Sequence, residues 1–183
     1  TKASMPTARA ALAAAAPGNG KLYAIGGVTA FLGSGLTTNQ EYNPSTNTWT
    51  SKAAMPTARA GLAAAAPGNG KLYALGGYDG SSWLATNEEY DPTTNTWTTK
   101  ANMPGGRSGG SFAAAPGNGK IYCVGVPTYE YNPSTNTWTI KADAPEATAA
   151  VAAPGNGKLY AMGGFYTGTY TASNINLEYT PPG

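Results

Sequence analysis

The chain contains the same 23-residue block twice. Met5–Gly27 reads MPTARAALAAAAPGNGKLYAIGG, and Met55–Gly77 repeats it 50 residues later with only two changes, at Gly61 and Leu75. Catalysis needs one set of chemical groups in one place, whereas a duplicated block of this length supplies the same structural unit more than once. The duplication therefore indicates a repeat architecture and says little about function.

Four copies of the unit align along the chain. PGNGK begins at Pro17, Pro67, Pro116 and Pro154, and is followed by LYAIGG, LYALGG, IYCVGV and LYAMGG. Further on, EYNPSTNTW or EYDPTTNTW begins at Glu41, Glu89 and Glu130, and the last copy has EYTPPG from Glu178. Each copy thus contains the same blocks in the same order, which predicts one structural element per copy.

Turn chemistry divides each unit into strands. Pro-Gly-Asn-Gly between two apolar runs favours a β-hairpin, because glycine and asparagine tolerate positive φ. Asn43-Pro44 has the order preferred at the start of a type I turn. The alanines at 13–16 are too few for an independent helix and run into Pro17, so we expect them to form the innermost strand. With 25 glycines and 14 prolines in 183 residues, the sequence predicts an all-β chain.

The unit resembles the kelch repeat, which builds the blades of β-propellers. The resemblance covers almost the whole chain. Its double glycine stands at 26–27, 76–77 and 163–164, its tyrosine at Tyr42, Tyr90, Tyr131 and Tyr179, and its tryptophan at Trp49, Trp97 and Trp138. The third copy departs from the pattern with Gly125-Val126, and the fourth lacks the tryptophan.

The resemblance implies an all-β, kelch-type β-propeller of four repeats, each with four antiparallel strands. We expect a single domain over residues 1–183, with repeats at about 5–54, 55–102, 103–143, and 144–183 together with 1–4. Thr1–Pro6 aligns with Ser51–Pro56, and the NTWT stretch is what the last copy lacks. We therefore predict a closed four-bladed ring in which the N-terminal segment completes the last blade. Half of an eight-bladed dimer and a fragment of a larger propeller are the alternatives.

Antiparallel strands distribute the connections over two faces. The face with the near-identical PGNGK and NPSTNTW turns is called the turn face here. The opposite face, called the loop face, carries the connections between the second and third strands, which begin at Val28, Tyr78, Pro127 and Phe165 and differ in length and chemistry. Because loops on a rigid scaffold commonly carry binding sites, we expect function on the loop face.

Two residue groups are candidate ligand contacts on the loop face. The first is the three arginines that precede the innermost strands, Arg9, Arg59 and Arg107. In kelch adaptors of ubiquitin ligases, arginines at this repeat position bind acidic peptide side chains, so the resemblance implies an anion-binding arginine ring. The alternative interpretation is that each arginine caps backbone carbonyls, or pairs, within its own blade.

The second group is the loop aromatics, Phe31, Tyr78, Trp83, Phe165, Tyr166 and Tyr170. Such rings anchor protein partners or stack on sugars. The lysines and the glutamates at 41, 89, 130 and 178 recur at fixed repeat positions, which indicates a scaffold role.

Residue chemistry argues against catalysis. The chain has no histidine, so the formal G-x-S-x-G at 106–110 has no histidine base. Among proteins with kelch repeats, galactose oxidase and the iron-dependent specifier proteins use histidines at their metal sites, so the resemblance does not imply their chemistry for this chain. Asp79 alone falls short of a calcium cage. We expect no cofactor and no metal. Cys123 replaces the alanine of the other copies, so we expect a small buried residue rather than a reactive thiol.

The sequence therefore predicts a non-enzymatic module that binds a protein or peptide, with an acidic peptide as one candidate. The alternatives are a structural or self-associating repeat scaffold, natural or engineered, and a carbohydrate-binding propeller. A dispersed net charge of +2 excludes a basic nucleic-acid footprint. We expect no membrane span and no signal peptide at Thr1, and the composition favours an extracellular or cell-surface location.

Overall fold

The computed structural model describes residues 1–30, 33–105, 113–143, 147–165 and 172–181. Over these ranges the chain forms fifteen strands and no helix. The described residues accordingly offer no helix that could cross a membrane. The all-β prediction is confirmed.

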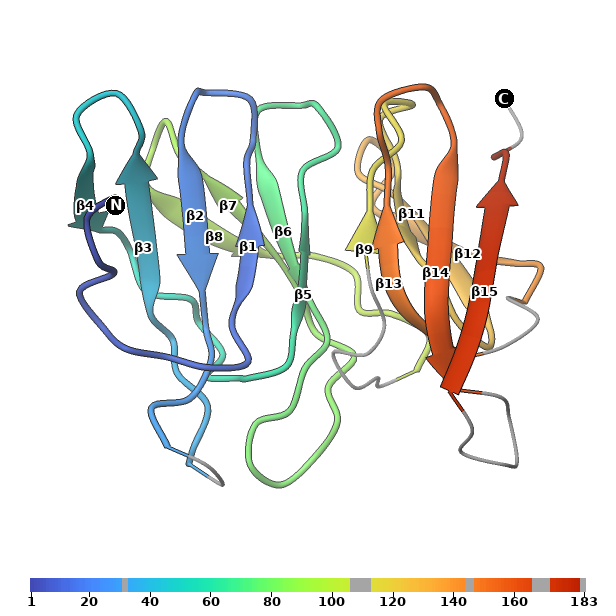
Figure 1. The fold of residues 1–183 in the computed structure, drawn as a ribbon, viewed down its shortest axis with the longest axis horizontal. Helices are drawn as coiled ribbons and strands as arrows, with labels where there is room; N and C mark the ends of the chain where they lie inside the picture. Colours follow the sequence, from blue (N-terminus) through green and yellow to red (C-terminus); the bar gives the residue numbers. More distant parts are fainter. Residues whose placement is uncertain (31–32, 106–112, 144–146, 166–171, 182–183) are drawn as a thin grey trace.

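The strands form four antiparallel sheets, each following chain order from an inner to an outer strand (Figure 1). Blade 1 consists of β1 (Ala13–Ala15), β2 (Leu22–Ile25), β3 (Asn39–Asn43) and β4 (Thr48–Ser51). Blade 2 consists of β5 (Ala63–Ala65), β6 (Leu72–Leu75), β7 (Asn87–Asp91) and β8 (Thr96–Thr99). Blade 3 consists of β9 (Ala113–Ala114), β10 (Ile121–Cys123), β11 (Thr128–Asn132) and β12 (Thr137–Lys141), and blade 4 of β13 (Ala147–Ala152), β14 (Leu159–Phe165) and β15 (Ala172–Tyr179). This arrangement is a four-bladed β-propeller.

The alanine-rich strands lie innermost, as predicted. β1 contacts β5, β5 contacts β9 and β9 contacts β13. A hollow between the blades is lined almost entirely by small residues of these four strands, including Ala64, Ala114 and Ala152. Small side chains let four strands approach one axis, which explains why each copy has alanines here.

The double glycine is required by the close approach of neighbouring backbone. Gly26 has φ +65°, and a Cβ there would lie 2.6 Å from the carbonyl oxygen of Arg59 in the next blade. Gly27 has φ +99°, and its Cβ would lie 2.7 Å from the oxygen of Ala10. Any side chain would therefore push apart the segments that enter blades 1 and 2.

Apolar side chains fill the interfaces between blades. Because successive residues of a strand point to opposite faces, each second strand serves two interfaces. Tyr23 and Ile25 of β2 point toward blade 2 and pack with Leu72, Ala74 and Tyr90. The same repeat positions pack blade 2 against blade 3 and blade 3 against blade 4. Cys123 is buried in the interface between blades 2 and 3, as the alanine of the other copies suggested.

The end of the predicted ring differs from expectation. The fourth sheet has three strands, and residues 1–4 form no strand in it. Instead the Ala3 amide donates to Asn47 Oδ1 (2.8 Å) and Trp49 Nε1 donates to the Ala3 carbonyl (2.9 Å). Ala53 makes the same pair of bonds with blade 2, so this local motif holds the N-terminal segment on blade 1. The prediction that it completes the last blade is wrong.

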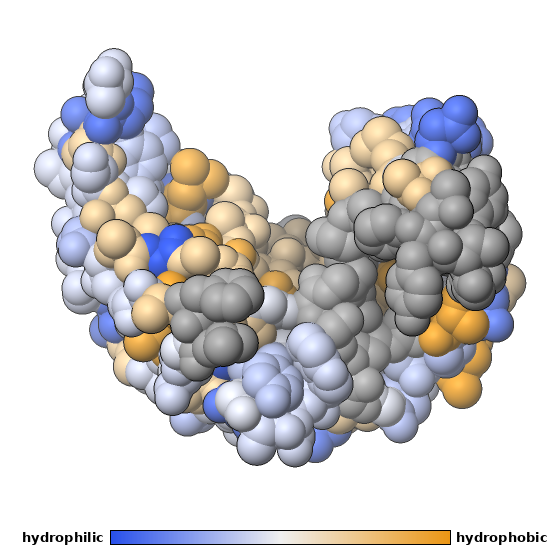
Figure 2. Space-filling view, turned by 60° about the horizontal axis from the view of Figure 1, so that its bottom comes forward, coloured by the Kyte–Doolittle hydropathy of each residue, from blue (hydrophilic) through white to orange (hydrophobic). Residues whose placement is uncertain are grey.

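The four blades form an arc with an open side (Figure 2). In the same view blade 1 and blade 4 lie at the two ends of the arc. The four-bladed architecture is therefore confirmed, whereas the expected closure of the ring is not present in this structure.

Candidate functional site

The two connection faces are separated as predicted. The tight turns that follow the first and third strands lie at the top of Figure 1, and the connections between second and third strands lie at the bottom. The loop from Tyr78 to Thr86, between β6 and β7, is fully described and projects from the loop face.

This loop presents a pair of aromatic rings. Tyr78 is 36% exposed and Trp83 is 54% exposed. Their ring centroids are 4.9 Å apart with planes tilted by 48°, and their backbones form an antiparallel bridge. Both rings therefore stand side by side in solvent, held by the base of a small hairpin.

Asp79 fixes the tip of the same loop. Its Oδ1 accepts hydrogen bonds from the Ser81 amide (2.7 Å), the Ser81 hydroxyl (2.8 Å) and the Ser82 amide (2.8 Å). The Ser82 amide bond, followed by those from Ser81, lowers the pKa of the Asp79 carboxyl below its ordinary value. The carboxylate thus organises an Asx turn, and the loop holds its two rings without needing a ligand to order it.

Arg59 is enclosed in the scaffold. Its side chain is 0% exposed. Nη1 donates to the carbonyls of Gly76 (2.8 Å) and Thr86 (3.0 Å), and Nη2 donates to the carbonyl of Ala74 (3.1 Å) and to Glu88 Oε2 (2.8 Å). Nε lies 3.3 Å from Met55 Sδ, so all five guanidinium N–H groups have a partner. Burial lowers the pKa of Arg59, and the Glu88 carboxylate opposes this shift.

Arg9 makes the corresponding contacts in blade 1. Its Nη atoms donate to the carbonyls of Gly26 (2.5 Å), Ala24 (3.2 Å) and Thr38 (3.3 Å), and to Gln40 Oε1 (2.9 Å). Two of the three arginines therefore cap strand carbonyls within their own blade, which confirms the alternative interpretation for them. Arg107 lies outside the described residues, so an anion contact there stays a prediction.

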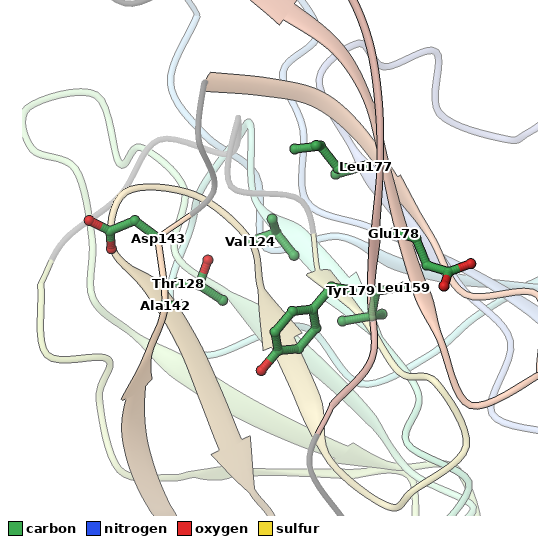
Figure 3. A pocket seen from close by; sticks show the side chains of 9 residues that line it. Val124, Thr128, Ala142, Asp143, Leu159, Leu177, Glu178 and Tyr179 are labelled. Atoms are coloured by element: carbon green, nitrogen blue, oxygen red, sulfur yellow. The ribbon is translucent and has the colours of Figure 1, made fainter.

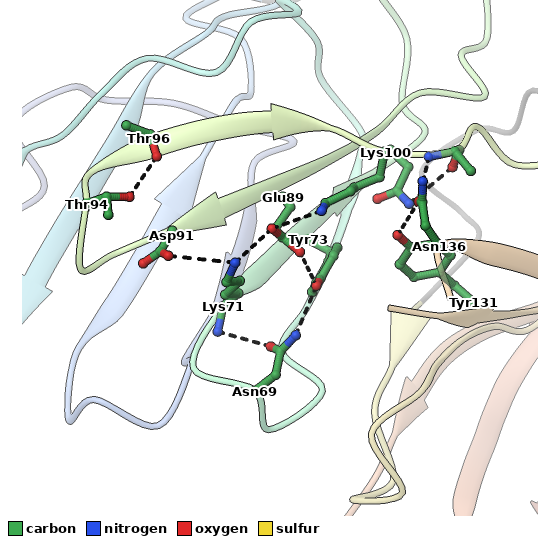
Figure 4. A network of polar contacts seen from close by, with 12 residues as sticks. Asn69, Lys71, Tyr73, Glu89, Asp91, Thr94, Thr96, Lys100, Tyr131 and Asn136 are labelled. Carbon is green, nitrogen blue, oxygen red and sulfur yellow. Dashed lines mark hydrogen bonds and ion pairs between the residues drawn. The ribbon is translucent and has the colours of Figure 1, made fainter. Parts of the chain in front are cut away.

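The recurring lysines and glutamates also belong to the scaffold. In blade 2, Glu89 accepts from the Tyr73 hydroxyl and pairs with Lys71 (3.1 Å) and Lys100 (3.2 Å), while Asn69 donates to Tyr73 (Figure 4). Burial alone would raise the pKa of Glu89, but the hydrogen bonds from Tyr73 and the two lysines outweigh it and hold this pKa below its ordinary value. Blades 1 and 3 repeat the cluster around Glu41 and Glu130.

The remaining aromatic candidates are not placed by this structure. Phe31, Tyr166 and Tyr170 lie outside the described residues, and Phe165 is the last residue of β14 with its side chain outside the description. They stay predictions. Among the aromatic candidates whose side chains are described, the structure brings Tyr78 and Trp83 together.

Sequence reasoning missed a cavity between blades 3 and 4. Its volume is about 190 Å³, and its lining includes Val124, Leu159, Leu177 and Tyr179. Figure 3 shows Val124, Leu177 and Tyr179 around this space, whereas the Glu178 carboxylate points away from it. Met55 and Met103 fill the two earlier interfaces, and the aligned position in the fourth copy is Ala144. That substitution was the available signal.

The described residues contain no group of three or more histidine, cysteine, aspartate or glutamate side chains placed to hold a metal ion. Among the described residues, the glutamates of the third strands pair with lysines or with Arg59, whereas the rings of Tyr78 and Trp83 are exposed. This arrangement is suited to contact with another surface.

The comparisons agree with this architecture. The solved structure of YjhT matches with a TM-score of 0.78 at 19% sequence identity, over 95% of this chain and 67% of that one. No match is found among curated protein sequences. A family model described as the Kelch motif matches residues 9–56 and 59–104, which together make up half of the sequence. These matches coincide with blades 1 and 2 and their double glycines, and the chain belongs to the kelch-repeat family.

Proposed function

We propose that this protein is a non-enzymatic binding module that captures a protein or peptide on its loop face, with Tyr78 and Trp83 as the anchoring residues. The observation that carries the proposal is the exposed, ordered ring pair in the loop between β6 and β7. Membership in the kelch family supports a general protein-binding role. The absence of histidine from the sequence removes the most common general base.

The physical advantage of this pair is a low ordering cost. Tyrosine and tryptophan provide large contact areas with few rotatable bonds, and they are enriched among the residues that dominate binding energy. The Asp79 turn and the Tyr78–Trp83 bridge already hold the loop. Binding therefore loses little conformational entropy at this site.

The loop face varies from blade to blade, as expected of a binding surface, whereas the turn face is repeated. The turn face repeats one set of Gly, Asn, Lys and Glu contacts in each blade, and these contacts are satisfied within the scaffold. Tyr78 and Trp83 are not part of the motif that all copies share. At the same distances from the double glycine the first copy has Val28 and Gly33, whereas the fourth copy has Phe165 and Tyr170. These two positions therefore vary between copies, unlike the repeated framework.

The proposal is tested by selecting binders from a random-peptide phage library on the immobilised protein and measuring the enriched peptides by isothermal titration calorimetry. Trp83→Ala should weaken binding at least tenfold, since removal of a central aromatic anchor commonly costs 2 kcal/mol or more. Ile140→Ala on the outer strand β12 is the matched control, because Ile140 is 63% exposed but outside the loop.

Selection of peptides that bind Trp83→Ala and the unmodified protein equally would refute the anchoring role. A glycan array run in parallel tests the carbohydrate alternative. Binding of a sugar that depends on Trp83, with no enriched peptide, would replace the peptide proposal by sugar stacking on the same rings.

A further inference from the structure

The two ends of the arc expose residues that every internal interface buries. Leu22, on the blade 1 face turned away from blade 2, is 46% exposed, whereas its equivalents Leu72, Ile121 and Leu159 are 0%, 0% and 1% exposed. At the other end, Met162 is 41% exposed. Its equivalents in the three preceding blades, Ile25, Leu75 and Val124, are all buried. The outer face of blade 1 and the outer face of blade 4 are thus the two halves of one interface type.

A tyrosine pair marks each internal interface. Tyr23 meets Tyr90 with ring centroids 5.6 Å apart, Tyr73 meets Tyr131 at 5.6 Å, and Tyr122 meets Tyr179 at 5.9 Å. In each pair the first ring comes from the second strand of one blade and the other from the third strand of the next. By this rule Tyr160 of blade 4 and Tyr42 of blade 1 would pair with each other across the open side.

The charged cluster around Glu178 in blade 4 lacks, among the described residues, the second lysine of the other clusters, and the N-terminal segment contains a lysine at that repeat position. Glu41, Glu89 and Glu130 each contact two lysines, the second being Lys52, Lys100 and Lys141. Among the described residues Glu178 pairs with Lys158 alone, at 2.6 Å, and its side chain is 45% exposed. Lys2 occupies the same repeat position as Lys52. The Ala3 contacts with Asn47 and Trp49 hold this segment on blade 1.

We propose that a second copy of this chain docks head to tail, with blade 1 of one copy seated on blade 4 of the other. The contact places Tyr42 against Tyr160, covers Leu22 and Met162, and brings Lys2 to Glu178 to complete the last charged cluster. The occupant is a further copy because each exposed position matches a residue already used inside the chain, in apolar character, ring pairing and charge. This inference concerns assembly and is independent of the peptide-binding proposal.

The contact is heterologous, because different faces of the two copies meet. Such contacts close into a ring or continue as a filament. When two copies contact each other at both ends, the ring has eight blades, which is within the usual range for propellers. Each copy then buries the outer faces of both blade 1 and blade 4, so every blade packs against a neighbour on each side.

The test is the mass in solution, measured by multi-angle light scattering over a hundredfold range of concentration. We expect about twice the chain mass of 18.5 kDa. Leu22→Glu and Met162→Glu should each give the monomer, because each places a charge in an apolar contact. Ile140→Glu is the control and should remain dimeric, since Ile140 is exposed on β12 away from both end faces.

Mixing the two disrupted variants distinguishes head-to-tail docking from any symmetric dimer. A pair made of one Leu22→Glu chain and one Met162→Glu chain retains one fully intact junction, so the mixture should form dimers that neither variant forms alone. A symmetric contact gives no such rescue. Lys2→Glu and Glu178→Lys should each raise the dissociation constant several-fold, and combining both changes in one chain should restore it.

A monomeric unmodified protein at the highest concentration would overturn the proposal and favour closure within one chain. Failure of the mixed variants to associate would also overturn it, as would dimers that neither end-face variant disturbs. A series of larger species abolished by both variants would support the docking contact and refute the two-chain ring. Circular dichroism of each variant, with an unchanged β spectrum, separates loss of assembly from loss of folding.

Discussion

Arg59 offers a direct test of whether its repeat position serves the scaffold. Arg59→Ala removes a guanidinium with no exposed surface, together with its bonds to three strand carbonyls and to Glu88. Glu88 is itself 1% exposed and would keep its hydrogen bond from the Thr57 hydroxyl (2.7 Å). Removing one member of a buried ion pair leaves an uncompensated charge, which costs about 3–5 kcal/mol.

This cost is large compared with the stability of a typical domain, about 5–15 kcal/mol. The matched control is Glu88→Gln, because blade 1 already uses that arrangement. There Gln40 Oε1 accepts from Arg9 (2.9 Å) and Gln40 Nε2 donates to the Thr7 hydroxyl (3.0 Å). Gln at position 88 can make the same two bonds with Arg59 and Thr57, and Arg59 keeps its three carbonyl partners. We therefore expect a smaller loss than for Arg59→Ala, although the buried guanidinium loses its counter-charge.

Urea unfolding followed by tryptophan fluorescence and far-ultraviolet circular dichroism measures both variants. The expected order is unmodified protein, Glu88→Gln, then Arg59→Ala. A loss below about 1 kcal/mol for Arg59→Ala would refute the reasoning, since removal of a buried arginine that supports the fold must cost more than this. Equal losses for the two variants would show that the carboxylate charge, rather than the carbonyl caps, dominates.

Two further predictions concern the interfaces and the charged clusters. Met103→Ala should create a space between blades 2 and 3 like the cavity between blades 3 and 4. It should lower the free energy of unfolding, measured by urea titration, by about 2–5 kcal/mol. Met5→Ala, at the same repeat position but half-buried, should lower it clearly less. The pKa values of Glu41, Glu89 and Glu130 are held below the ordinary 4.5, so folding keeps these carboxylates ionised more readily than the unfolded chain does. Their contribution is complete above that value and is lost as the pH falls through the lower folded-state values. The unfolding free energy measured between pH 6 and pH 3 should therefore fall in acid, and Glu89→Gln should reduce this slope; an unchanged slope would exclude a role for that cluster.

Most of the fold was predictable because the determining signals are local and repeated. The Pro-Gly-Asn-Gly stretch specifies a hairpin in each copy. The alanine run that precedes it in the first copy has four residues, which is too short for a stable helix. The double glycine contributed to the kelch resemblance, whereas the carbonyls of Arg59 and Ala10 that require it are seen only in the structure. The open arc was not predictable, because sequence complementarity between the ends does not show that the ends meet. Ala3 binds Asn47 and Trp49 of blade 1 as Ala53, which follows β4 of blade 1, binds Asn95 and Trp97 of blade 2, so this contact is consistent with an open arc and with a closed ring.

In the candidate site, the sequence pointed to the loop aromatics as a varying feature but could not decide the role of the arginines. An arginine that follows Met-Pro in repeated units is equally consistent with a ligand contact and with a carbonyl cap, and only the distances from Arg59 to Gly76, Thr86 and Ala74 decide between them. Trp83 differs from the arginines, because its position varies between copies, with Gly33 in the first and Tyr170 in the fourth. A residue present in all copies is explained by the blade that it builds, whereas a large exposed ring that the first copy lacks is not needed for the common scaffold. The binding proposal therefore depends on Tyr78 and Trp83, and the assembly proposal on Leu22 and Met162, whose exposure departs from that of their own repeat equivalents.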